Sequence, residues 1–245
     1  MDPVTRTLKR SSAMARTNPD DLYALQLAVK LKRQTEAEIV AVSMGPASAE
    51  EVLREALQRG AHKAVLLSSK AFAGSDTWCT SLVLAAAVRK LGEYDLLLFG
   101  KMAVDGDTAQ IGPELAGAFE IPCVTDVSCV QSAGFTTCGS LALVHGCDAG
   151  EETVCLEMPC AMTTAKEIGQ LRMPSIAGIR AAEEADVRVV SAADVNADPA
   201  RCGLAGSPTQ VVRSFVPDRD QTCEAVEGTA SEQASKLAKI IEGMA

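Results

Sequence analysis

The sequence predicts an α/β protein with an open, mostly parallel sheet and helices on both of its faces. Over the first half of the 245 residues, short apolar runs alternate with segments of helical periodicity, which is typical of such folds. The runs are continuously apolar, so we expect strands that are buried on both faces. No run approaches the roughly 18 apolar residues of a membrane-spanning helix, so we expect no membrane insertion.

The first elements follow this alternation. Residues 19–33 have helical spacing, with acidic side chains at the start and basic ones at the end. The apolar run at 38–46 predicts a strand that ends in a Gly-Pro turn. A second helix is expected over 48–60, where Ser48 and Glu51 have the spacing of a capping box and a glycine ends the helix.

The alternation continues as far as Pro122. KAVLLSS and YDLLLFG are predicted strands, and the helix between them is expected to begin after Asp76. Residues 124–163 then contain apolar segments separated by glycines, which predict antiparallel strands added to the sheet. A short helix and the strand VRVV complete the first predicted domain, residues 1–190.

The last part of the chain, residues 191–245, is rich in loops and ends in the helical segment ASEQASKLAKIIEG. We interpret it as a C-terminal arm that packs on a partner, because such an arm cannot bury its own apolar face. An ordinary set of surface loops is the alternative.

Composition excludes several classes of function. The net charge of −9 argues against nucleic-acid binding through bulk electrostatics. Residues 1–33 carry seven basic and three acidic side chains, which fits either a basic arm for an acidic partner or a solvated helix face. The nine cysteines include no CxxC pair and there are two histidines, so we expect reduced thiols and no metal site. The sequence shows no secretory signal, and we expect a cytoplasmic protein.

The segment GKMAVDGDTAQIGP, residues 100–113, is the strongest candidate for a ligand site. It follows a predicted strand and leads into a helix, which is where open α/β sheets bind ligands. Amides at the helix start and the Thr108 hydroxyl can hold a phosphate, Gln110 can donate from its amide, and Gly106 permits close approach of the backbone. The alternative is a tight loop in which Asp107 only caps the helix.

Three weaker candidates lie elsewhere. Ser43–Gly45 ends another predicted strand, Asn18 precedes the first helix, and Thr125 lies in a strand. A Gly-Pro turn and a helix cap at Asn18 are the structural alternatives. The sequence motifs of serine hydrolases, P-loop kinases and Rossmann dehydrogenases are absent, so no catalytic residues are expected.

These segments resemble those of electron-transfer flavoprotein β subunits (the EtfB/FixA family). The resemblance covers nearly the whole chain. Its motifs are NPDD at 18–21, VSMGP at 42–46, EAL at 55–57 with GA at 60–61, DTW at 76–78, DGDTAQIGP at 105–113, IP at 121–122 with VT at 124–125, TAKEI at 164–168 and GSPT at 206–209.

The resemblance implies a fold like that of the adenine-nucleotide α-hydrolases and a partner α subunit that carries an exchangeable FAD. It also implies a nucleotide in the β subunit, which is a structural AMP in some members and a second FAD in electron-bifurcating members. The residues implied to bind this nucleotide are Asn18, Ser43, Met44, Gly45, Asp105, Gly106, Asp107, Thr108, Ala109, Gln110, Ile111, Gly112 and Thr125.

The DGDTAQ form resembles the bifurcating members, in which NADH reduces the β-site flavin. One electron then passes to a ferredoxin or flavodoxin, and the other passes through the α-subunit flavin to an acyl-CoA dehydrogenase. A non-bifurcating subunit with structural AMP is one alternative. A nucleotide-binding regulatory module without electron transfer is another.

The resemblance further implies a docking segment near Leu171–Ile179, with contacts from Arg172, Pro174, Ile176 and Ile179. Ile176 matches the apolar anchor that inserts into an acyl-CoA dehydrogenase, and such an anchor is a reasonable hot spot. Many members have a lysine run where this chain has AAEEA, which puts the usual partner or its orientation in question.

Family members also begin with an apolar central strand. This sequence begins with MDP, which resembles the hairpin that follows that strand. We therefore expect the first strand to be missing and the neighbouring sheet edges to be exposed.

Overall fold

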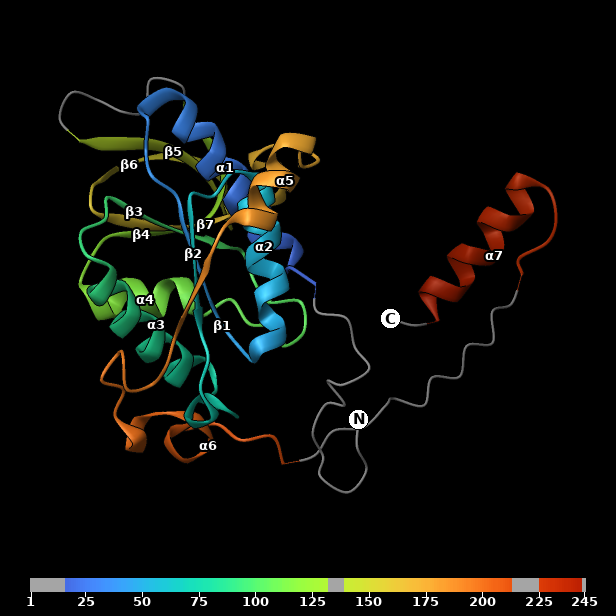
Figure 1. Ribbon diagram of the computed structural model, residues 1–245. Helices are drawn as coiled ribbons and strands as arrows, with labels where there is room; N and C mark the ends of the chain where they lie inside the picture. Colours follow the sequence, from blue (N-terminus) through green and yellow to red (C-terminus); the bar gives the residue numbers. More distant parts are fainter. Residues whose placement is uncertain (1–15, 132–138, 213–224, 244–245) are drawn as a thin grey trace. The chain divides into compact units, whose positions relative to one another are not determined.

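The computed structural model describes residues 16–131, 139–212 and 225–243 (Figure 1). The chain divides into two compact units, with the boundary between Gln210 and Val211. Within the described ranges, no helix is both long enough and apolar enough to cross a membrane.

Two sheets form the centre of the first unit. The first has the order β1-β2-β8, with all strands parallel. The second has the order β3-β7-β4-β5-β6, in which β3, β7 and β4 are parallel and β4, β5 and β6 are antiparallel. The strands are β1 (Val40–Met44), β2 (Lys63–Leu67), β3 (Leu96–Gly100), β4 (Cys123–Val130), β5 (Ser140–Cys147), β6 (Gly150–Glu157), β7 (Cys160–Thr164) and β8 (Val187–Val190). The predicted α/β class with open, mostly parallel sheets is confirmed.

The hydrogen-bonded strands form two sheets where the sequence suggested one. In the described chain, β1 pairs only with β2, and β3 pairs only with β7. Among the described residues, both strands are therefore sheet edges.

The segment 124–163 is only partly antiparallel, which corrects the prediction. The apolar stretch 153–165 is divided, since β6 ends at Glu157 and β7 begins at Cys160. β7 pairs in parallel with both β3 and β4. All of its residues are buried, as expected for a central strand with both faces covered. Its complete burial, which includes Thr163 and Thr164, is thus that of a parallel central strand.

Helices cover both faces of each sheet, as predicted (Figure 1). The helices of the first unit are α1 (Pro19–Thr35), α2 (Glu50–Arg59), α3 (Thr77–Leu91), α4 (Ile111–Phe119), α5 (Ile176–Glu184) and the short α6 (Gly203–Gly206). Alternate residues of β2 point to opposite faces of the first sheet, and each face is covered by a different helix. Ala64 and Leu66 pack with α2, whereas Val65 and Leu67 pack with α3.

The second sheet is covered by α1 and α4 in the same way. Leu27 and Leu31 of α1 share a core cluster with Met162 of β7. On the other face, a Cβ added to Gly112 of α4 would lie 2.7 Å from the Thr163 methyl group. Glycine therefore permits the close packing of α4 on β7.

Two predicted helix ends are confirmed. The Asp76 carboxylate accepts a hydrogen bond from the Cys79 amide at 3.0 Å and caps α3. Gly60 ends α2 with a φ of 120°, a backbone conformation that favours glycine. Both signals are local in the sequence, which explains why they could be read from it.

The capping box predicted from Ser48 and Glu51 is wrong. A 3₁₀ turn precedes α2, which begins at Glu50 with Ala49 in the N-cap position. Ser48 lies inside this turn, where its carbonyl accepts the Glu50 amide. With Ala49 as the N-cap residue, Ser48 lies one residue too early for its side chain to cap the helix.

The second unit contains α7 (Ala230–Glu242), which confirms the predicted C-terminal helix. A capping box of Thr229 and Glu232 begins it. Leu237, Ile240 and Ile241 are exposed, and their helical spacing places them on one side. The helix therefore presents an apolar side among the described residues.

We expect Met162→Ala to lower the free energy of unfolding by about 2–5 kcal/mol, because a fully buried side chain leaves a cavity between α1 and β7. Met173→Ala is the matched control, since Met173 is 86% exposed. Urea unfolding of both variants measures the difference. Equal losses would contradict the position of β7 in the core.

Candidate functional site

The candidate segment forms a turn at the carboxyl end of β3. The Ala103 amide donates to the Thr108 carbonyl at 2.8 Å and closes the turn. Residues 104–107 are exposed, and Asp107 has a φ of 50°. The backbone amides of the turn are thus presented at the edge where parallel strands of open α/β sheets bind ligands.

Two side chains at the start of α1 fasten this turn. The Asn18 amide nitrogen donates to the Met102 carbonyl at 2.8 Å, and its oxygen accepts the Val104 amide at 3.3 Å. The Asp21 carboxylate accepts the Gly100 amide at 2.8 Å. We call these contacts the α1 clamp. The side chain of Asn18 thus binds the turn and does not cap the helix.

Gln110 ties the other end of the turn to α3. Its side-chain oxygen accepts a hydrogen bond from the Thr77 hydroxyl at 2.6 Å. α4 begins at Ile111, so Gln110 is its N-cap residue and Asp107 lies outside the helix. The alternative in which Asp107 caps the helix is therefore wrong. Gln110 was predicted to face a ligand, and its amide nitrogen remains the group for that role.

A charged pair borders the turn on the side of β4. The Lys101 ammonium lies 2.8 Å from the Asp126 carboxylate. Asp126 has a φ of 58° at an irregularity in the β4–β7 pairing, and its amide donates to the Thr163 hydroxyl at 3.0 Å. Thr125, a predicted site residue, is exposed next to this pair. The structure thus brings the Thr125 region and the turn together.

Ser43–Gly45 end β1 and belong to the other sheet. Ser43 lies in register with Leu66, and the Gly45 amide donates to the Leu67 carbonyl at 3.0 Å. A Cβ on Gly45 would lie 2.8 Å from that of Ala49, so glycine permits the turn into α2. These bonds tie the segment to β2, and its contact with a ligand stays a prediction.

The residues present suit a phosphate-bearing ligand. A Cβ on Gly106 would meet its nearest neighbour, the Thr108 methyl group, at 3.7 Å, which is an ordinary contact without a clash. The start of α4 supplies positive potential, whereas the Lys101 ammonium is already paired with the Asp126 carboxylate. Asp105 and Asp107 are exposed and carry negative charge, so a phosphate would have to approach the backbone amides. AMP and FAD both have phosphates of this kind.

A pocket of about 590 Å³ lies at the opposite, amino end of β3. Its wall includes Tyr94 and Phe119, whose rings pack edge to face with their centroids 5.3 Å apart. Arg89 lies 4.9 Å above the Phe119 ring and donates to the Ala118 carbonyl. This pocket lies at the other end of β3 from the turn. Its lining is partly aromatic, whereas the turn presents mainly backbone and small polar groups.

The docking segment lies on the surface of the first unit. Ser175 caps α5 by accepting the Gly178 amide at 3.0 Å. Ile176 is 74% exposed, and Ile179 and Arg172 are exposed as well. Pro174 is half-buried. The exposure of Ile176 is what an apolar anchor needs, while its partner contact stays a prediction.

Sequence reasoning did not assign roles to Asp21, Thr77, Lys101 or Asp126. Asp21 and Thr77 lie in the matched motifs NPDD and DTW, which was the available signal. Their partners are far away in the sequence, and the pairing required the fold.

Asp76 supports the site through α3, and its pKa is predicted to govern a pH-dependent contribution to stability. Burial alone would raise the pKa of Asp76, but hydrogen bonds from Cys79, Thr209 and Ser207 outweigh burial and lower it. A lowered folded-state pKa adds stability above the unfolded value of 3.8, and this stability is lost as the pH falls through the folded-state pKa.

We expect Asp76→Ala to cost about 1–2 kcal/mol at neutral pH through the lost cap, and the difference from wild type to shrink in acid. Unfolding at several pH values measures this. Asp148→Ala, in the exposed β5–β6 turn, is the control and should stay within about 0.5 kcal/mol. A difference that did not change with pH would exclude the ionised cap.

Comparison with known proteins identifies the chain's family. The sequence model of the electron transfer flavoprotein domain family matches residues 5–195 of this chain. A caffeyl-CoA reductase–Etf complex subunit, CarD, of Acetobacterium woodii is 39% identical over 94% of this chain and 86% of its own length. The electron transfer flavoprotein subunit beta of Thermoanaerobacterium thermosaccharolyticum is 38% identical over 97% and 90%.

A third relative is the acryloyl-CoA reductase electron transfer subunit gamma of Anaerotignum propionicum, which is 36% identical over 94% of this chain and 88% of its own length. In all three comparisons the matched region covers more than nine-tenths of this chain and more than four-fifths of the relative. The chain therefore belongs to the electron-transfer flavoprotein β subunit family.

Proposed function

We propose that this β subunit pairs with an α subunit and holds FAD at the turn after β3, as part of an electron-bifurcating flavoprotein. The observation that carries the proposal is the DGDTAQ turn, held at one end by the α1 clamp and at the other by Thr77. The relatives named for caffeyl-CoA and acryloyl-CoA reductases support a role in electron transfer to an acyl-CoA partner.

The chain's own residues would bind and orient the nucleotide. Amides of residues 106–110 and the start of α4 would hold the phosphates. Asn18 and Asp21 would fix the turn, so that less conformational entropy is lost on binding. The bound flavin would accept two electrons from NADH and release them singly, towards a ferredoxin or flavodoxin and towards the α-subunit flavin.

The acyl-CoA dehydrogenase partner would dock at the exposed segment 171–179. Ile176 would be the anchor, because it is exposed at the start of α5. Glu183 and Glu184 follow on α5, where many members have lysines, so the partner surface beyond the anchor would differ in charge. The apolar side of α7, with Leu237, would pack on the α subunit.

The cofactor content of the complex tests the proposal. Co-expression with the α subunit, followed by extraction and chromatography of the nucleotides, should give two FAD per heterodimer. Under anaerobic conditions, NADH should then reduce both flavins, with the electrons entering at the flavin held by this subunit. One FAD and one AMP would favour the non-bifurcating alternative. A complex without FAD would overturn both assignments.

A double variant of the turn tests its contact with the nucleotide. We expect Thr108→Val with Gln110→Ala to weaken binding of FAD or AMP about tenfold or more, since each lost hydrogen bond contributes about 1 kcal/mol. Isothermal titration measures the affinity. Thr77→Val separates the effects, because it releases Gln110 from α3 but keeps its amide.

Thr153→Val, on the exposed face of β6, is the control and should bind normally. Unchanged affinity in the double variant would show that the turn does not bind the nucleotide. A loss in Thr77→Val as large as in the double variant would assign Gln110 a role in fastening the turn only.

A further inference from the structure

A continuous row of polar contacts runs from the start of α1 to the docking segment. The Thr17 hydroxyl donates to the Glu55 carboxylate on α2. One oxygen of Glu55 accepts two hydrogen bonds from the Arg59 guanidinium, at 2.9 and 2.6 Å. Arg59 then donates to the Arg172 carbonyl at 2.7 Å. We call these four residues the α2 relay.

Both ends of the α2 relay lie at proposed sites. Thr17 precedes Asn18, whose side chain holds the backbone of the turn at Met102 and Val104. Arg172 belongs to the docking segment and lies four residues before the anchor Ile176. A shift of the chain at residues 17–18 would therefore change contacts at the turn and at Glu55 together.

The docking segment depends on this support. The Arg172 carbonyl is held by Arg59, and its amide donates to the Gln26 side chain of α1 at 3.2 Å. Gly178 of α5 lies directly against the Gln58 carbonyl, so a side chain there would clash with α2. The exposed anchor is thus placed by α1 and by the last turn of α2.

The pair at the centre of the relay is partly shielded from water. The side chains of Arg59 and Glu55 are 17% and 30% exposed. Burial raises the pKa of Glu55, but its bonds from Thr17 and Arg59 outweigh burial and lower it. Glu55 is therefore ionised at neutral pH, and its hydrogen bonds are charge-assisted. The planar guanidinium fork of Arg59 lets it hold Glu55 and Arg172 at once.

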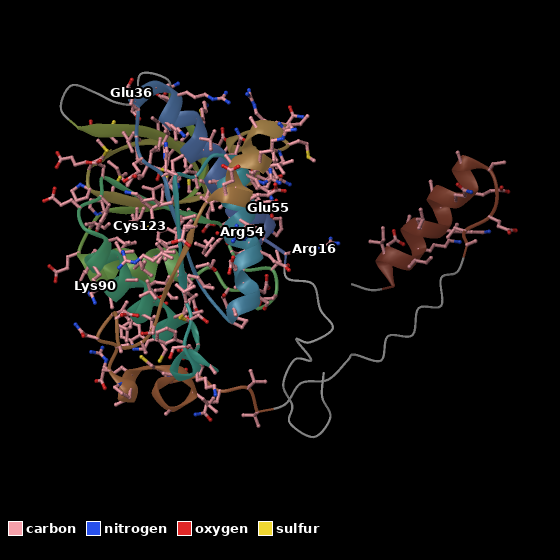
Figure 2. The ribbon with its side chains drawn as sticks, viewed as in Figure 1. Arg16, Glu36, Arg54, Glu55, Lys90 and Cys123 are labelled. Atoms are coloured by element: carbon pink, nitrogen blue, oxygen red, sulfur yellow. The ribbon has the colours of Figure 1, made fainter. Side chains whose placement is uncertain are left out.

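Packing around the first contact of the relay is loose. A pocket of about 250 Å³ adjoins Thr17 and Glu55, and Arg16 also lines it. Figure 2 labels Glu55 on α2 and Arg16 at the start of the described chain. With this pocket beside it, the hydroxyl–carboxylate bond of Thr17 can respond to events at residue 18, whose side chain is bound to the turn.

We propose that Glu55 and Arg59 are positioning residues that couple nucleotide binding at the turn to the order of the docking segment. The coupling rests on the proposed function. A nucleotide on the turn would fix the Asn18 contacts, hold Thr17 against Glu55, and through Arg59 restrain Arg172 and the anchor that follows. Linkage makes the effect reciprocal, so a docked partner would tighten nucleotide binding by the same factor.

Hydrogen–deuterium exchange on the full chain, with and without saturating AMP or FAD, tests the coupling. In wild type, peptides covering 100–112 should be protected by the nucleotide itself. Peptides covering 169–179 should gain protection of about fivefold or more, the lower end of common coupling factors. A merely structural role of Arg59 would give protection that does not depend on the nucleotide.

Three variants separate the relay from general stability. Arg59→Lys keeps the charge but loses the fork, and Thr17→Val removes the hydroxyl. Both should keep the nucleotide-dependent protection of 100–112 and lose that of 169–179. Thr17→Ser keeps the hydroxyl and should restore the coupling. Arg54→Lys is the matched control, since Arg54 lies on the same helix, pairs with Glu50 and donates to the Ala182 carbonyl.

The outcomes are distinguishable. Protection of 100–112 without any change at 169–179 in wild type would overturn the coupling and leave the proposed function standing. Coupling that persists in both Arg59→Lys and Thr17→Val would also overturn it, because the contacts of the α2 relay would then not be needed for the coupling. Absence of protection at 100–112 with both nucleotides, together with no heat of binding, would reject the nucleotide site and the coupling together.

Discussion

The α1 clamp is the interaction on which the site depends. Asn18 and Asp21 hold the main chain at Gly100, Met102 and Val104, so the turn after β3 is fixed by the start of a helix 79 to 86 residues earlier. Main-chain groups in a turn otherwise remain mobile, and a mobile turn loses more entropy when it binds a phosphate. The clamp thus converts an exposed turn into a prearranged set of donors.

The rest of the fold serves this arrangement. β7 lies between β3 and β4 and is buried throughout, so the edge that carries the turn and the Lys101–Asp126 pair stands on a rigid centre. Gly112 brings α4 close to β7, which places the helix start beside the turn. From the same start of α1, the α2 relay leads to the docking segment. One helix end therefore contacts the proposed nucleotide site directly and the proposed partner site through α2.

Much of the fold could be predicted from the sequence, because its signals are local. Continuous apolar runs predicted the parallel strands, and Asp76 and Gly60 marked helix ends through short-range bonds. The capping box at Ser48 failed because the backbone of a 3₁₀ turn took its place. The position of β7 between β3 and β4 and the bonds of Asn18 and Thr77 join distant segments, and no local pattern specifies them. The turn itself was found because a strand end followed by a helix start is a local pattern with a general ligand-binding meaning.

The most direct measurement of the central claim is the change in backbone amide chemical shifts of the full chain during titration with FAD. We expect the largest shifts at residues 106–112, with a further shift at the side-chain amide of Asn18, which holds the turn. Shifts confined to the pocket lined by Arg89, Tyr94 and Phe119 would contradict it, because the nucleotide would then bind at the opposite end of β3.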